Sequence, residues 1–167
     1  MKYTIKKILY NLLILNIFLI INIFTLSFKI NNNQTLIINS LKQSIDIKHN
    51  INIFTKNVII KKDSIIIYAD KVLIIYSNTN QKNFYIKAYG NPVFFSQIKN
   101  INKPIKGYAK QIYYNSKTQS ITLIGNVFLK QLNNNIKSDR IIYLINKEQI
   151  QAFSKKNKHI TTTLILS

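Results

Sequence analysis

The chain has 167 residues, which is enough for one domain with a core of its own, and it contains no cysteine. The absence of cysteine excludes a disulfide framework, a thiolate zinc finger and a thiol nucleophile. The formal net charge of +19 suggests an anionic partner, but abundant Ile, Asn and Lys are also what an AT-rich genome produces, so both explanations stay open.

The N-terminal segment has the pattern of an export signal. Three lysines precede an apolar run from Ile8 to Phe28, and this order is typical of a secretory signal or of an uncleaved anchor. The run is long enough to span a bilayer, but its three asparagines disfavour a permanent span. A small-x-small pair ending at Ser27 favours cleavage there. We therefore predict a signal peptide over 1–27 and an exported domain over 28–167, with an uncleaved anchor as the alternative.

The exported part predicts β-strands almost throughout. Short runs of Ile, Val, Tyr, Phe and Thr alternate with turn clusters about every ten residues, which is typical of an all-β sandwich or barrel. No sustained helical period is present after residue 30. Turns are expected at 31–34, 61–63, 77–83, 90–92, 99–104, 115–119 and 132–135, and "IGN" (124–126) is interpreted as a further turn.

A repeat runs through the predicted strands. "FTKNVIIKKDSIIIYADKV" (54–72) aligns without gaps on "LIGNVFLKQLNNNIKSDRI" (123–141), which places Asp70 on Asp139. A degenerate middle copy combines "GNPVFF" with "GYAKQIYY" and has Lys110 in place of the aspartate. Each copy reads as a strand going out and a strand coming back. The sequence therefore predicts a wall of repeated antiparallel hairpins.

Strand periodicity assigns one apolar face to each copy. Side chains two residues apart share a face of a strand, and a bulge or turn at the aspartate would switch that parity. The interior between strands would then be apolar, although periodicity leaves open whether it is packed or holds a ligand. The expected inward residues are Phe54, Val58, Ile60, Ile67, Val72, Ile74, Leu123, Val127, Leu129, Ile136, Ile141 and Tyr143.

The sequence shows no catalytic constellation. Asp70 and Asp139 occupy equivalent repeat positions, so a role at strand ends explains them better than acid–base chemistry. His49 and His159 lie in polar, lysine-rich contexts, where a solvated position is the default. No glycine spacing of a phosphate loop is present. We therefore expect no enzyme activity, no metal and no cofactor, and export argues against a nucleic-acid partner.

Several stretches resemble the LptA/OstA family, the periplasmic bridge for lipopolysaccharide export. They are the repeat copy at 54–72, "YGNPVFF", "LIGNVFLKQLNNNIKSDRIIYL" and "QAFSKKNKHITTTLILS", and the similarity runs from about Leu36 to Ser167. The resemblance implies an open-seamed β-jellyroll of antiparallel strands in the periplasm, without a cofactor. It also implies that acyl chains slide along the apolar interior, and it places lipid-facing positions at Leu36, Ile38 and Phe95.

The resemblance further implies the partners. Family members stack head to tail by pairing edge strands, and they join an inner-membrane anchored receptor to an outer-membrane translocon while binding the lipid A part of lipopolysaccharide. One departure is Lys56, which stands where the family has the glycine of the first "GNV" copy. Two alternatives remain open: a membrane-anchored component of the same machine, and a basic periplasmic protein whose polyanion binding would collapse in salt.

Overall fold

The computed structural model describes residues 35–77, 83–101 and 103–165. The predicted signal peptide over 1–27 and the turn expected at 31–34 lie outside this part. Every regular element in the described residues is a β-strand, and these strands form one antiparallel sheet. No helix within these ranges is long and apolar enough to cross a membrane. The expected all-β class is confirmed.

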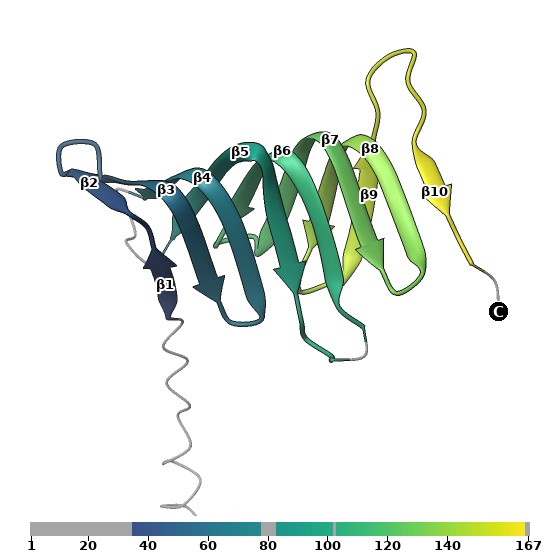
Figure 1. Ribbon diagram of the computed structural model, residues 1–167, viewed down its shortest axis with the longest axis horizontal. Helices are drawn as coiled ribbons and strands as arrows, with labels where there is room; N and C mark the ends of the chain where they lie inside the picture. The colour runs from purple at the N-terminus through teal and green to yellow at the C-terminus, as the bar shows by residue number, and fades with distance from the viewer. Residues whose placement is uncertain (1–34, 78–82, 102, 166–167) are drawn as a thin grey trace, which may run out of the picture. The chain divides into compact units, whose positions relative to one another are not determined.

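Six long strands form the body of the sheet, and short strands extend each end (Figure 1). Each long strand pairs antiparallel with the next one in the chain. This order is the repeated hairpin wall that the sequence predicts. The strands are β1 (Leu36–Asn39), β2 (Lys42–Asp46), β3 (Ile51–Lys62), β4 (Ile65–Tyr76), β5 (Phe84–Gln97), β6 (Ile105–Asn115), β7 (Ser120–Gln131), β8 (Asn134–Leu144), β9 (Gln149–Phe153) and β10 (Thr161–Thr163).

A line of bulges divides the sheet into two walls. Each pairing between long strands shifts register near mid-strand, as between Thr55 and Val58 of β3, and a bulge bends and twists its strand. The strands fold over along this line (Figure 1). We call the two halves wall A, formed by 58–62, 65–69, 93–97, 105–109, 127–131 and 134–138, and wall B, formed by 51–55, 71–76, 84–89, 111–115, 120–124 and 140–144.

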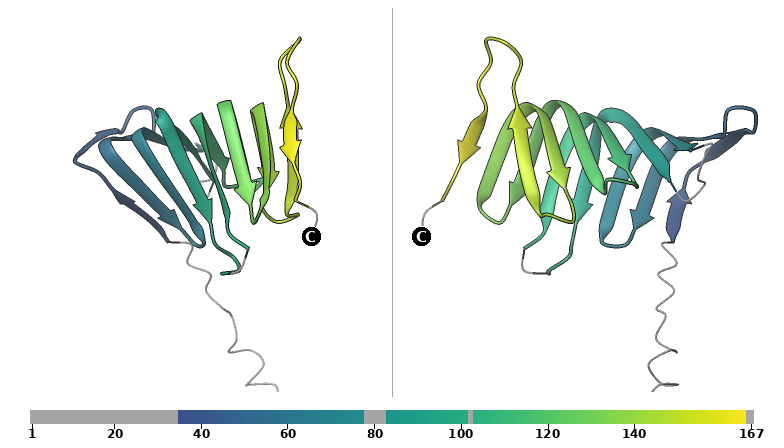
Figure 2. Two further views of the ribbon diagram at one scale, coloured as in Figure 1. Left: turned by 45° about the vertical axis from the view of Figure 1, so that its right-hand side comes forward. Right: turned by 180° about the vertical axis from the view of Figure 1, so that it is seen from behind.

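The short strands extend the two walls separately. β1 pairs with the wall A half of β3, and β2 pairs with the wall B half of the same strand. At the other end, β10 extends wall A and β9 extends wall B, both from β8. Figure 2 shows these strands at the two ends of the sheet. Each wall therefore ends in an edge strand on both sides.

The expectation of turns at 90–92 and 124–126 is wrong. Both segments lie inside continuous strands, β5 and β7, where they form bulges of the central line. Glycine and asparagine are typical of tight turns, but the same residues supply the positive φ that a bulge needs. Gly125 and Asn126 have φ of 83° and 49°. Gly125 and Asn126 thus indicate an unusual backbone conformation correctly, but that conformation is a bulge and not a chain reversal.

The parity switch expected at the aspartate is confirmed. In β4 the buried side chains are Ile65, Ile67 and Ala69 before Asp70, and Val72 and Ile74 after it. The bulge therefore keeps the apolar side chains on the inner face of both walls. Lys110 of the middle copy lies at the same bulge line in β6, as its place in the repeat predicts.

The first and last repeat copies share one backbone conformation although their residues differ. Lys56 and Asn57 have φ of 68° and 52°, which matches the signs at Gly125 and Asn126. A lysine in this left-handed region is strained by its Cβ, whereas glycine is not.

We therefore expect Lys56→Gly to raise the free energy of unfolding by about 1 kcal/mol. Gly125→Ala should lower the free energy of unfolding by a similar amount, because alanine at a φ of 83° is strained. The atoms nearest to its new Cβ belong to the Lys110 side chain, 3.2–3.3 Å away. Urea unfolding of both variants measures the two shifts. A loss of stability in Lys56→Gly would contradict a strained Lys56.

Candidate functional site

The apolar interior lies between the two walls, and it contains every residue that the sequence places there. The twelve residues assigned by periodicity and the three assigned by resemblance either belong to one buried cluster or pack against it. Their inward placement is confirmed, while their contact with a lipid stays a prediction. Leu36, Ile38 and Ile136 are partly buried, and the others, including Phe95, are buried.

The interior is filled by its own side chains. Val72, Leu123 and Ile141 have 0% of their surface exposed, and Phe95 has 2%. Such packing leaves little room for an added acyl chain, because protein interiors are packed as densely as organic crystals. A chain that enters this space has to separate the walls. Burial of its methylenes would compensate, at about 0.8 kcal/mol for each CH₂.

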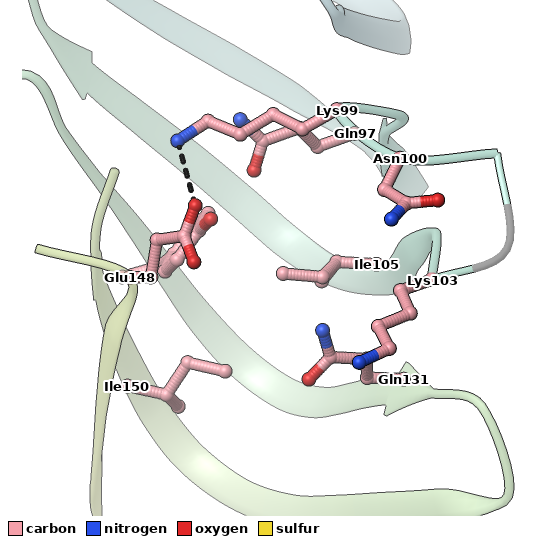
Figure 3. Close-up of a pocket in the computed structure, with 9 residues that line it drawn as sticks. Gln97, Lys99, Asn100, Lys103, Ile105, Gln131, Glu148 and Ile150 are labelled. Atoms are coloured by element: carbon pink, nitrogen blue, oxygen red, sulfur yellow. Dashed lines mark hydrogen bonds and ion pairs between the residues drawn. The ribbon is translucent and has the colours of Figure 1, made fainter. Parts of the chain in front are cut away.

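The walls meet again opposite the line of bulges, along an edge that we call the seam. There the wall A turns and loops (62–65, 98–101, 103–104 and 131–134) lie opposite the wall B loops that include 145–149. Lys99, in the wall A loop between β5 and β6, crosses the seam, where its Nζ donates to the Ile145 carbonyl at 3.1 Å. The same Nζ lies 3.1 Å from Glu148 Oε1, as Figure 3 shows. Both side chains are largely exposed, so this ion pair contributes little to stability.

A second contact joins the walls near the seam. Lys62 of wall A is 5% exposed, its Nζ lies 2.6 Å from Asp63 Oδ2, and it lies 5.8 Å from the centre of the Tyr114 ring of wall B. A charged amine that is nearly buried needs such partners, because desolvation disfavours it. Burial raises the pKa of Tyr114 above its usual value. Lys62 was not predicted as an inward residue, although its parity with Val58 and Ile60 indicates this position.

Two of the carboxylates, Asp139 and Asp46, make structural contacts. Asp139 accepts hydrogen bonds from the Lys155 amide at 2.9 Å and from Ser154 Oγ at 3.2 Å. The hydrogen bond from the Lys155 amide is the main reason that the pKa of Asp139 is lowered. Asp139 thereby holds the segment that leads from β9 towards β10. Asp46 pairs with His49 at 2.8 Å. In the described ranges no three His, Cys, Asp or Glu residues gather as a metal site would require.

A cavity of about 450 Å³ opens at the seam between the walls (Figure 3). Gln97, Lys99, Lys103 and Gln131 line it from wall A, and Glu148 and Ile150 line it from the opposite side. Ile105 and Tyr143, both members of the buried cluster, also line it. The cavity therefore borders the apolar interior directly.

These features define a class of protein: a folded antiparallel sheet with an apolar interior, edge strands at both ends and no catalytic group set among its described side chains. A solved structure shares the fold. It is LptH from Pseudomonas aeruginosa, described as the LptA homologous periplasmic component of the lipopolysaccharide transport device, with a TM-score of 0.73, 15% identity, and coverage of 81% of this chain and 99% of that one. The fold is thus the expected β-jellyroll.

Sequence comparison leads to the family. The lipopolysaccharide export system protein LptA of Escherichia coli K12 is 36% identical over 167 residues, covering 100% of this chain and 90% of that protein. LptA of Haemophilus influenzae is 36% identical over 136 residues, covering 81% of this chain and 79% of that protein. The family model described as LptA/(LptD N-terminal domain) LPS transport protein matches residues 37–149. The chain belongs to this family.

Proposed function

We propose that this chain is a periplasmic bridge protein that binds lipopolysaccharide by its lipid A acyl chains and carries it from the inner to the outer membrane. The observation that carries the proposal is the apolar interior between two walls, which the exposed Lys99–Glu148 ion pair joins weakly at the seam. Apolar burial is non-directional, so a sliding acyl chain has no fixed hydrogen bonds to break. No bond is made or broken in this function, and no cofactor takes part.

The experiment that tests this function uses photo-crosslinking side chains in the full chain. A crosslinker at Phe95 reports the interior, one at half-buried Ile38 provides a second inward position, and one at exposed Lys61 is the outward control. The proteins are mixed with lipopolysaccharide that carries its acyl chains or lacks them. We expect crosslinking at the inward positions only, dependent on the acyl chains and unaffected by salt.

Equal crosslinking at all three positions, lost in high salt, would overturn the proposal. It would leave a basic protein that attracts polyanions through its net charge of +19. The predicted signal peptide over 1–27 is part of the proposal, and mass spectrometry of the exported protein tests it. A retained N-terminus would instead favour the membrane-anchored component of the same machine.

We also propose that copies of the chain stack head to tail, and that the same edges pair with an inner-membrane anchored receptor and an outer-membrane translocon. Edge strands present unpaired amides and carbonyls that another strand can pair with. Exposed apolar side chains gather at both ends of the sheet, where a soluble monomer would favour charges. They are Ile37, Leu41, Ile45 and Ile47 at one end, and Phe153, Ile160, Leu164 and Ile165 at the other.

Charged substitutions at the two ends should therefore weaken self-association. We expect Ile45→Lys or Leu164→Lys to reduce the association constant roughly tenfold, equivalent to ~1.4 kcal/mol, as measured by sedimentation velocity. Ile101→Lys is the matched control, because Ile101 is 85% exposed but lies in the loop between β5 and β6. An equal effect of all three substitutions would show that association follows charge rather than the edges.

A further inference from the structure

The seam cavity contains a buried polar group without a partner. Gln97 is 2% exposed, and its Oε1 makes no hydrogen bond with any described residue, while its Nε2 donates to Ser64 Oγ at 3.3 Å. Turning the amide over would exchange the two atoms and again leave one unpaired. Figure 3 shows the side-chain oxygen directed towards the middle of the cavity. An unpaired buried polar atom is costly, and a ligand hydroxyl, which both donates and accepts, would satisfy either orientation.

Two lysines stand at the same cavity. Lys99 and Lys103 line it, with Glu148 as the only lining carboxylate among the described residues. Glu148 pairs with Lys99, whereas the Lys103 amine forms no ion pair with any described side chain. The balance of charge at the cavity is therefore positive. A lysine amine is a compact cation that suits phosphate.

The cavity also has the position that an amphiphilic ligand requires. Ile105 and Tyr143 line it and belong to the buried cluster, so a ligand with its polar group here would extend its apolar part between the walls. Gln131 supplies a further amide at the rim. A free phosphate ion would use the lysines but not the apolar side.

We propose that this cavity binds the phosphorylated sugar headgroup of the amphiphile whose acyl chains enter the interior. Lys103 and Lys99 bind its phosphate, and Gln97 hydrogen-bonds a sugar hydroxyl. Phosphate competes with Glu148 for Lys99, so headgroup binding breaks the ion pair across the seam. This inference rests on the proposed function. It assigns to the cavity the binding of the headgroup while walls A and B separate.

The test measures equilibrium binding of the full chain to lipid A with its phosphates and to the same lipid A with the phosphates removed, at physiological ionic strength. We expect the wild-type chain to bind the phosphorylated lipid about tenfold more tightly, as a charge-assisted contact implies. Lys103→Gln should remove most of this preference and leave binding of the dephosphorylated lipid unchanged. Glu148→Gln should increase the preference. Lys61→Gln, an equal change of charge on the outer face, should have no effect.

Two further measurements identify the class of ligand. Gln97→Leu should raise the melting temperature of the unliganded chain, because it removes the unpaired atom, and should weaken binding of both lipids several-fold. Inorganic phosphate should compete only at concentrations far above those of lipid A. Competition at equal concentrations would show a free-anion site and overturn the headgroup assignment.

The outcomes separate this inference from the proposed function. Equal affinity for both lipids, unchanged in Lys103→Gln and with acyl-dependent crosslinking at Phe95, overturns the headgroup site alone. Failure of both lipids to bind, with no crosslinking at Phe95, overturns the proposed function and the inference together.

Discussion

A crosslink across the seam is expected to prevent loading of lipid. In Lys99→Cys/Glu148→Cys the two thiols are the only ones in the chain, since the sequence has no cysteine, so a short bis-maleimide joins wall A to wall B. The side chains of the buried cluster are only 0–8% exposed, so an acyl chain has little room unless the walls separate. Loading of lipopolysaccharide should slow about tenfold or more, which corresponds to ~1.4 kcal/mol of added barrier.

The same double variant without the reagent is the reference, because both proteins then lack the Lys99–Glu148 ion pair. A crosslink within one wall provides the matched control. Lys106 and Lys130 face each other on neighbouring strands β6 and β7 of wall A, so joining them restrains no wall movement. If the crosslinked seam loads lipid as fast as its reference, lipid enters from the ends of the sheet and the seam is not the route.

Phe95→Ala is expected to be among the most destabilising single substitutions in the chain. Phe95 is 2% exposed and lies opposite Gly107 on β6. Gly107 has no side chain that could fill the space left by the ring, and a Cβ at this position would lie 2.9 Å from Leu129 Cδ1 and closer still to the Phe128 carbonyl oxygen. The cavity left by the ring would therefore stay unfilled, and the free energy of unfolding should fall by about 3–5 kcal/mol.

The neighbouring phenylalanine is a control with the same change in composition. Phe94 points to the outer face, is 50% exposed, and contacts the Tyr108 ring at 6.3 Å between centroids. Phe94→Ala should cost no more than about 1 kcal/mol. Urea unfolding of both variants makes the comparison. Similar losses would show that the two faces of β5 are equally packed, which would contradict a single buried interior.

The sequence was sufficient to predict the class of fold and the inner face. The two repeat copies, 54–72 and 123–141, place apolar residues two positions apart and allow for one parity switch at Asp70 and Asp139. The apolar spacing and the parity switch are local properties of a strand, so the periodicity of the sequence reveals both. The polar inner residues were missed because Lys62 and Gln97 follow the same parity at strand ends, where a polar residue normally indicates solvent.

The tertiary structure decided what local patterns do not encode. In the sequence, Gly125 and Asn126 indicate an unusual backbone conformation. Only the pairing of β7 with β6 and β8 shows that this conformation is a bulge and not a turn. Likewise, Lys99 and Glu148 are far apart in the chain, and folding of the sheet along its bulges brings them together. By itself the sequence determined the inward face of the repeat strands, through the parity of their apolar side chains. The folded sheet decided that the walls close on each other, because contact between them depends on a bend shared by all six long strands.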